Sequence, residues 1–97
     1  MNLNSRDLSI IRNYFSTQPV LKAYLFGSYS RGEACENSDI DILVELDYSK
    51  QIGWSYFSMK DELENQLQKK VDLVSAKGLS KYIAPIIEQE KQLIYER

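Results

Sequence analysis

The spacing of apolar residues changes along the chain and predicts its helices and strands. Near the N-terminus, apolar side chains recur every three or four positions, as they do on one face of a helix. They are Leu8, Ile11 and Phe15. Asn4 or Ser5 can cap the start of this helix, and Pro19 cannot continue it. We therefore expect a first helix that ends near Thr17.

Two strands are predicted next. Residues 20–26 are apolar except for Lys22, and Gly27 follows them. Such a short apolar run is typical of a strand that is covered on both faces. From Ser38 to Leu46 the pattern alternates, so that every second side chain faces the same way. One face carries Ile40, Ile42, Val44 and Leu46, and the other carries Asp39, Asp41, Leu43 and Glu45. The second strand therefore has carboxylates on one face.

The remaining elements follow from the same patterns. Residues 53–68 carry an apolar stripe with helical spacing, made up of Tyr56, Met59, Leu63 and Leu67. Residues 71–75 predict a short third strand. A last helix begins at Ser80 or, because proline fits the first turn of a helix, at Pro85. Residues 92–95 are either the end of that helix or a fourth strand at the edge of the sheet, and we favour the strand.

Length and charge limit the possible functions. The chain has 97 residues, enough for one compact core, so we expect residues 1–97 to form a single domain. Its 12 Lys and Arg residues against 14 Asp and Glu residues leave a formal net charge of −2. This balance offers no excess positive field for a phosphate backbone, so we expect no stable binding of nucleic acid.

Cysteine and histidine usage limits the chemistry further. Cys35 is the only cysteine and histidine is absent, so a disulfide framework is excluded and a metal must be held by oxygen ligands. We expect Cys35 to be an incidental loop thiol. The sequence shows neither a signal peptide nor an apolar run of the roughly 18 residues that span a membrane. We therefore expect no membrane association and a cytoplasmic location.

The segment after the first strand has the features of a phosphate-binding turn. Gly27 lacks a side chain that would keep a ligand from the backbone, and Ser28 adds a hydroxyl and an N–H. Arg31 lies about one helical turn further on, where it can bind phosphate oxygens or tie the loop down through a carboxylate. We predict that these three residues bind phosphate. For Arg31 an ion pair that stabilises the loop is an open alternative.

Asp39 and Asp41 are candidate metal ligands. They are two positions apart on a strand, so their carboxylates project from the same face, with about 7 Å between Cα atoms. Such close like charges raise one pKa and disfavour folding unless a cation neutralises them. Mg²⁺ fits, since it prefers oxygen ligands and is usually held by carboxylates together with substrate phosphates. In nucleotidyl transfer, two such ions can hold the attacking and leaving oxygens.

A third carboxylate is expected near the same ions. Asp72 is the best candidate, because Val-Asp-Leu-Val places one acid among core residues of a strand that can pair with the second strand. Asp47 and Asp61 are weaker candidates. We predict that Asp39, Asp41 and Asp72 are both the catalytic and the metal-binding residues.

Gly-Ser, ten further residues and Asp-x-Asp form a combination that resembles the signature of the polymerase-β-like nucleotidyltransferase superfamily. Over its whole length the chain resembles the minimal nucleotidyltransferase (MNT) proteins, which accompany HEPN-domain toxins as antitoxins. The matching residues are Gly27 and Ser28 for the phosphate-binding pair, and Asp39, Asp41 and Asp72 for the three aspartates. Ser30 stands where many relatives have alanine, which affects no catalytic group.

The resemblance implies an α+β fold (mixed α/β) with a small mixed sheet flanked by helices. It also implies Mg²⁺-dependent use of ATP, with two ions in the active complex. The chain then transfers AMP to an acceptor hydroxyl, a tyrosine of the partner HEPN toxin, and so acts as an antitoxin. The alternative is a catalytically weak or inactive antitoxin that neutralises its toxin by forming a complex.

A third function is a nucleotidyltransferase that acts on an antibiotic or RNA. It requires an additional domain to shape the acceptor site, for which 97 residues leave no room. Trp54, Tyr56 and Phe57 are expected in the core or at a partner interface, rather than as a platform on which a base stacks. The sequence leaves homo- and hetero-oligomers open.

Overall fold

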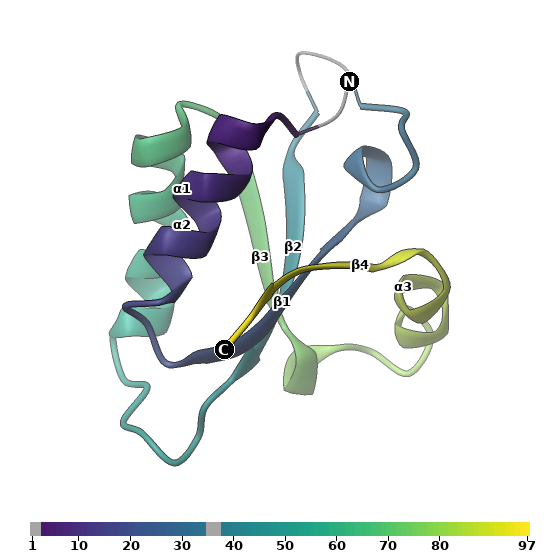
Figure 1. The fold of residues 1–97 in the computed structure, drawn as a ribbon. Coiled ribbons are helices and arrows are strands. Elements are labelled where there is room, and N and C mark those ends of the chain that lie inside the picture. The colour runs from purple at the N-terminus through teal and green to yellow at the C-terminus, as the bar shows by residue number, and fades with distance from the viewer. Residues whose placement is uncertain (1–2, 35–37) are drawn as a thin grey trace.

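The computed structural model describes residues 3–34 and 38–97, and its helices and strands follow the predicted order (Figure 1). The helices are α1 (Ser5–Phe15), α2 (Ser55–Leu67) and α3 (Ala84–Glu90). The strands are β1 (Val20–Phe26), β2 (Ile40–Leu46), β3 (Val71–Ser75) and β4 (Gln92–Glu96). Short 3₁₀ turns, η1 (Gly27–Tyr29) and η2 (Ala76–Gly78), follow β1 and β3. The α+β class predicted from the sequence is confirmed.

Some boundaries differ from the prediction. α1 ends at Phe15, because the Thr17 N–H and hydroxyl both donate to a carbonyl of the last helical turn and close the helix. β2 and α2 each begin two residues later than predicted. The last helix begins at Ala84, with Pro85 in its first turn, where no N–H is needed. Ser80 starts a separate turn before it.

The described strands form one mixed sheet in the order β3-β2-β1-β4. β1 is antiparallel to both β2 and β4, whereas β2 and β3 are parallel. The prediction of a fourth strand at the edge is confirmed. In the register of the strands, Asp41 lies directly beside Asp72 and opposite Phe26. The end of β1 therefore meets the starts of β2 and β3 at one end of the sheet.

α1 and α2 cover one face of the sheet (Figure 1). The hydrophobic core lies between these helices and the sheet, and Phe15, Ile42 and Leu63 are fully buried there. α3 lies on the other side of the sheet, and only Ile87 of this helix is buried. Because α3 covers only part of that side, the expectation that the first strand is covered on both faces is wrong: Leu21 is 40% exposed.

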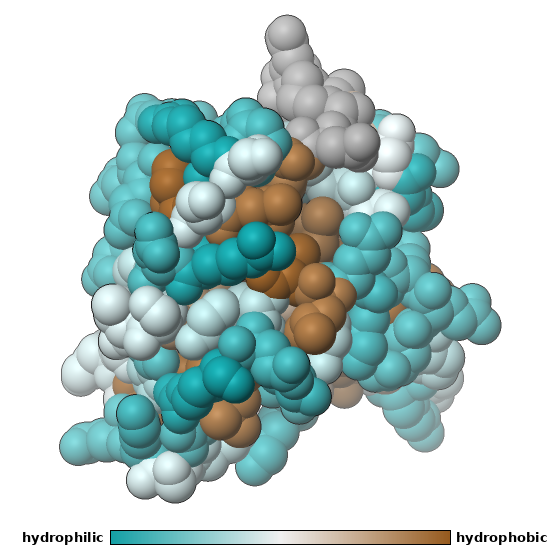
Figure 2. Space-filling model, viewed as in Figure 1, coloured by the Kyte–Doolittle hydropathy of each residue, from teal (hydrophilic) through white to brown (hydrophobic). Residues whose placement is uncertain are grey.

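β4 forms one edge of the sheet and receives a side chain from α1. Arg12 Nε donates a hydrogen bond of 2.7 Å to the Ile94 carbonyl. Leu93 of the same strand is half exposed, and Figure 2 shows hydrophobic side chains gathered over the middle of this side of the molecule. The edge strand thus combines an apolar surface with a charged side chain that binds its backbone.

Two buried carboxylates form ion pairs that the sequence did not predict. Asp7 is 1% exposed and lies 2.6 Å from Lys69 Nζ, which links α1 to the turn before β3. Asp47 follows β2 and accepts hydrogen bonds from Ser49 and Arg97, which lower its pKa to about 2. None of the helices in residues 3–34 and 38–97 has the length and apolar character of a membrane span.

Candidate functional site

β1 leads directly into the turn for which the sequence predicted phosphate binding. Gly27 has a φ of 73°, and its carbonyl accepts hydrogen bonds from the Ser30 N–H at 3.1 Å and from the Arg31 N–H at 3.2 Å. The Ser30 hydroxyl donates to the same carbonyl at 2.9 Å. These bonds wind the chain into a tight turn, η1, with the partly exposed Ser28 in its middle.

The turn is built against the Asp41 carboxylate. A Cβ atom added to Gly27 would lie 2.1 Å from Asp41 Oδ2 and 3.0 Å from its Cγ. No side chain fits at that distance, and a φ of 73° also disfavours any residue but glycine. Gly32 has almost the same φ, 72°, but a Cβ there would meet nothing within 4 Å. A side chain at Gly27 would therefore have to displace the Asp41 carboxylate in addition to adopting a strained backbone conformation.

The Asp41 carboxylate interacts with the charges of two other acids, Asp72 and Asp39. It lies beside Asp72 of the neighbouring strand and two positions after Asp39. Burial raises the pKa of Asp41 to about 6, the charges of Asp72 and Asp39 add to this rise, and Arg31 opposes it. The structure thus brings the three predicted metal ligands close enough together for their charges to interact.

The surroundings of Asp72 differ from the prediction. We expected an acid among core residues, but β3 is an edge strand and Asp72 is exposed. Its place beside Asp41 follows instead from the parallel register of β2 and β3. The weaker candidates lie elsewhere: Asp47 pairs with Arg97 after the far end of β2, and Asp61 belongs to α2, on the other face of the sheet.

The chemistry of these carboxylates fits a divalent cation. Carboxylate oxygens are preferred ligands of Mg²⁺, and a cation would favour the ionised form of Asp41, whose pKa is raised first by burial and then by the neighbouring negative charges. Within residues 3–34 and 38–97, no group of three or more acidic, cysteine or histidine side chains is already arranged around one point. Mg²⁺ at phosphoryl-transfer sites is usually completed by substrate phosphates, so the protein has to supply only part of the ligands.

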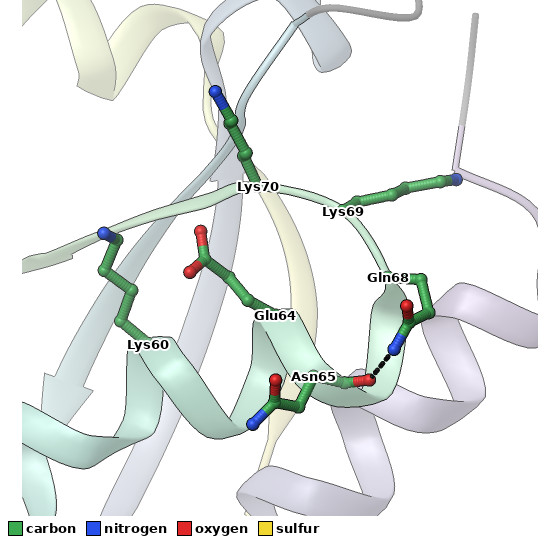
Figure 3. Close-up of a pocket in the computed structure, with 6 residues that line it drawn as sticks. All are labelled: Lys60, Glu64, Asn65, Gln68, Lys69 and Lys70. Atoms are coloured by element: carbon green, nitrogen blue, oxygen red, sulfur yellow. Dashed lines mark hydrogen bonds between the residues drawn. The ribbon is translucent and has the colours of Figure 1, made fainter.

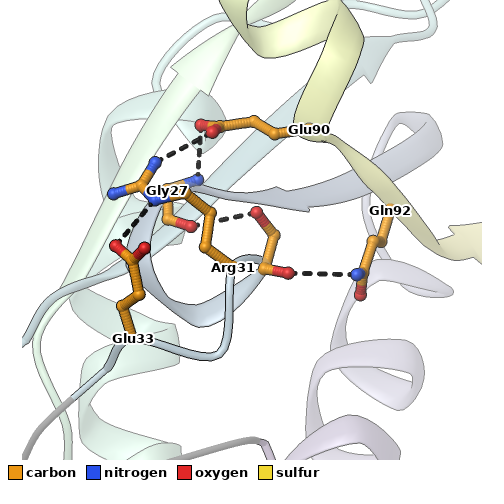
Figure 4. Close-up of polar contacts among 6 residues, drawn as sticks. Gly27, Arg31, Glu33, Glu90 and Gln92 are labelled. Atoms are coloured by element: carbon orange, nitrogen blue, oxygen red, sulfur yellow. Dashed lines mark hydrogen bonds and ion pairs between the residues drawn. The ribbon is translucent and has the colours of Figure 1, made fainter.

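Arg31 is held by two carboxylates (Figure 4). Its Nε lies 3.0 Å from Glu33 Oε2, and its Nη1 lies 2.8 Å from Glu90 Oε2. The other Glu90 oxygen accepts a hydrogen bond from the Gly27 N–H at 3.0 Å. Of the two roles left open for Arg31, the structure shows the tie to a carboxylate. A guanidinium has five N–H donors, so these contacts leave donors for a phosphate as well.

Sequence reasoning missed the part that the C-terminal segment plays in this site. Glu90 is 59 positions away from Arg31, and Gln92 Nε2 donates to the Ser30 carbonyl at 3.2 Å from 62 positions away. Only the pairing of β4 with β1 brings these residues together. Nothing in the sequence around Glu90 and Gln92 indicates that they contact residues 27–31.

The three aromatic residues at the start of α2 differ in their exposure. Trp54 is 85% exposed and Phe57 is 70% exposed, so of the two places expected for them the structure excludes the core, and the partner interface stays a prediction; Tyr56 is partly buried against the core. Burial raises the pKa of Tyr56 and the charge of Asp72 adds to this rise, so Tyr56 lies within electrostatic range of the carboxylates. Cys35 lies outside the described residues.

A separate surface hollow lies at the end of α2 (Figure 3). It is lined by Lys60, Glu64, Asn65, Gln68, Lys69 and Lys70. Two of its charged side chains are already engaged, since Glu64 accepts a hydrogen bond from the Val71 N–H at 2.8 Å and Lys69 pairs with Asp7. None of the predicted site residues lines this hollow, which is therefore distinct from the carboxylate group.

Known proteins are similar to this chain in both sequence and fold. Residues 9–97 match the protein family described as Polymerase beta, Nucleotidyltransferase. A relative from Methanocaldococcus jannaschii, provisionally named a protein adenylyltransferase, is 45% identical over 73 residues, which span 73% of this chain and 71% of the relative. One chain in a crystal structure of a toxin–antitoxin with AMP-PNP has a TM-score of 0.78 and 25% identity, covering 93% of this chain and 73% of that chain.

A second solved structure shares the fold alone. It contains a tri-AMPylated HEPN toxin of Shewanella oneidensis in complex with an MNT antitoxin. The matching chain has a TM-score of 0.70 and 22% identity, and the match covers 94% of this chain and 71% of that one.

Proposed function

Because the chain belongs to the polymerase β nucleotidyltransferase family, we propose that it is a Mg²⁺-dependent adenylyltransferase that transfers AMP from ATP to a tyrosine hydroxyl of a HEPN toxin. Family membership supports nucleotidyl transfer. Transfer of AMP is supported by the similarity to a protein adenylyltransferase, and the toxin by the similarity to chains of toxin–antitoxin complexes. In this proposal residues 1–97 act as one catalytic domain, which works as an antitoxin in the cytoplasm.

One observation supports the proposal most strongly. The Asp41 carboxylate occupies the space beside Gly27 where a side chain would otherwise lie, 2.1 Å from the position of a Cβ. A predicted phosphate turn and a predicted metal ligand are therefore in direct contact. Such contact is what a site needs if it is to hold a nucleotide phosphate and its cation together.

The proposed reaction exchanges one bond to phosphorus for another. The acceptor oxygen bonds to the α-phosphorus of ATP, while the bond from that phosphorus to the bridging oxygen breaks and pyrophosphate leaves. Ser28, the turn backbone and Arg31 hold the phosphates that leave. Asp72 accepts the hydroxyl proton, because it is exposed on an edge strand that an acceptor protein can reach.

The expected cation is Mg²⁺, with two ions in the active complex, and Asp39, Asp41 and Asp72 are the residues that would hold it. When bound, it supplies positive charge to the phosphate oxygens, on which negative charge develops during transfer. The chain's own contribution is the placement of these carboxylates at the meeting point of β1, β2 and β3.

Exposed apolar residues favour one alternative, in which the chain neutralises the toxin by complex formation alone. In and just before α3, Tyr82 is 78% exposed, Ile83 50% and Ile86 60%. A partner protein could cover these side chains without any chemistry. Both functions require contact with the toxin, so they must be separated by an experiment on the carboxylates.

The test is transfer of label from ATP to the protein encoded by the neighbouring reading frame. The purified chain is incubated with that protein, Mg²⁺ and ATP labelled at the α-phosphate. We expect label on the partner, and no label with EDTA or with the Asp39→Asn/Asp41→Asn double variant. Asp61→Asn, an exposed acid of α2, is the matched control and should transfer as the wild type does.

Two results would contradict the proposal. Absence of transfer from the wild-type chain to the partner would refute catalysis. If, in addition, the Asp39→Asn/Asp41→Asn chain still protected cells from the toxin, neutralisation would depend on complex formation alone.

A further inference from the structure

The contacts of the C-terminal segment point to a role for Glu90, and we propose that Glu90 is a positioning residue for nucleotide binding, which acts by orienting Arg31 and the Gly27 turn. The inference rests on the proposed function, since it assigns Glu90 to the same site. Glu90 is the last residue of α3, and its side chain is 18% exposed. It touches two predicted phosphate-binding residues without being one itself (Figure 4).

The position of Glu90 follows from the pairing of β1 with β4. Leu25 lies opposite Gln92 at the end of this antiparallel ladder, and if the same register were extended by two residues it would place Glu90 opposite Gly27. At that point the ladder has ended, because the chain has turned into α3. The Glu90 carboxylate accepts the Gly27 N–H at 3.0 Å in place of the backbone carbonyl that a longer strand would have offered. The side chain thus completes the edge of the sheet.

The position of the Glu90 carboxylate indicates that it supports the turn and does not compete with phosphate for it. The Gly27 N–H points toward the β4 side, whereas the Asp41 carboxylate lies where the Gly27 side chain would be. Glu90 and Asp41 therefore contact Gly27 at different positions, Glu90 at the backbone N–H and Asp41 where a side chain would lie, although the Glu90 charge still reaches Asp41. Its second oxygen binds Arg31 Nη1 at 2.8 Å while Glu33 binds Nε, and two such anchors fix the plane of the guanidinium.

A third contact from the same segment strengthens the connection. Gln92 Nε2 donates to the Ser30 carbonyl at 3.2 Å, so three hydrogen bonds join residues 90–92 to residues 27–31. An arginine held in this way reaches a phosphate with little loss of side-chain freedom, which favours binding. The consequence is that the affinity for nucleotide depends on Glu90, although Glu90 makes no contact with the nucleotide.

The experiment measures the affinity of the full-length chain for α,β-methylene-ATP with Mg²⁺ by isothermal titration calorimetry. The variants are Glu90→Gln, Arg31→Gln and the double variant, and Glu88→Gln is the matched control. Glu88 also lies in α3 and also pairs with a basic residue, Lys91, but it is 61% exposed and does not touch the turn. A partly unfolded variant lowers the stoichiometry, whereas the Kd reports on the molecules that are folded.

We expect Glu90→Gln to weaken binding about tenfold, as the loss of a charge-assisted hydrogen bond predicts. Glu88→Gln should bind as the wild type does. In the Arg31→Gln background, Glu90→Gln should weaken binding by less than it does alone, because the part of its effect that passes through Arg31 is already lost and only the contact with the Gly27 N–H remains. A role unrelated to Arg31 would give the full effect in both backgrounds.

Three results would overturn the inference. Unchanged affinity of Glu90→Gln would show that Glu90 does not position the turn. Tighter binding would show that its carboxylate competes with phosphate, and full additivity with Arg31→Gln would show that it acts by another route. If the wild-type chain bound no nucleotide at all, the proposed function would fail first, and the role of Glu90 with it.

Discussion

Replacing Gly27 with alanine tests the contact on which the site is built. The change has two costs, which the structure separates. A φ of 73° costs a residue with a side chain about 1–2 kcal/mol. The new Cβ would also lie 2.1 Å from Asp41 Oδ2, and relief of such an overlap typically costs about 1–3 kcal/mol. We therefore expect Gly27→Ala to lower the free energy of unfolding by about 2–5 kcal/mol.

Gly32→Ala is the matched control for this prediction. Its φ is 72° and its Cβ would have open space, so it incurs the conformational cost without the overlap. Urea denaturation of both variants at the same pH gives the two free energies. Their difference, about 1–3 kcal/mol, is the cost of displacing the Asp41 carboxylate.

Two further variants identify the group that is displaced. Asp41→Asn keeps the shape of the side chain, so the extra cost of Gly27→Ala should persist in that background. Asp41→Ala removes the overlapping oxygen, and the extra cost should largely disappear. If Gly27→Ala proved no more destabilising than Gly32→Ala, or if its extra cost survived in Asp41→Ala, the close approach would not be the reason for glycine at this position.

Two other predictions concern stability. The pKa of Asp41 rises from 3.8 to about 6 on folding, so the folded state binds this proton more tightly and wild-type stability falls as pH rises from about 4 to 6. In EDTA at pH 8, the free energy of unfolding of Asp41→Asn should therefore be about 1–2 kcal/mol higher than that of wild type, a value reduced for the partial exposure of Asp41. This difference, measured by urea denaturation, should vanish near pH 4. A difference that did not change with pH would contradict this origin. Lys69→Met leaves the buried Asp7 without its ion-pair partner and should cost about 1–3 kcal/mol in the same assay, less than for a fully buried pair because the Lys69 side chain is 33% exposed. Adding Asp7→Asn should recover part of this loss, whereas a Lys69→Met chain as stable as wild type would show that the pair is dispensable.

The sequence predicted those parts of the molecule that depend on local pattern. The alternation around Asp39 and Asp41 placed both carboxylates on one face, and the apolar runs marked β1 and β3. The phosphate turn and its aspartates were found because their chemistry is concentrated in one short segment. Their roles stay predictions, but their proximity in space is now established for Asp41 and Asp72.

Long-range contacts were beyond sequence reasoning. Glu90 reaches Arg31 only because β4 pairs with β1, and strand order is not encoded in the spacing of apolar residues. The exposure of Asp72 was misjudged for the same reason, since the run Val-Asp-Leu-Val looks identical in a central and in an edge strand. Trp54 was expected in the core or at a partner interface, and the sequence could not decide between them; the ring is 85% exposed and contacts Phe57 of α2, with 5.9 Å between the ring centroids.

The hydrogen bond from Arg12 to Ile94 bears on how this molecule meets other chains. An open edge strand with apolar side chains is a template on which strands of other molecules can add, and it leads to fibres when nothing opposes it. Arg12 occupies one carbonyl of β4 with a charged donor at 2.7 Å, so an added strand would have to displace a guanidinium before it could pair. Extension of the sheet through β4 is thereby discouraged, and we expect partners to be recognised by side-chain surfaces rather than by strand addition.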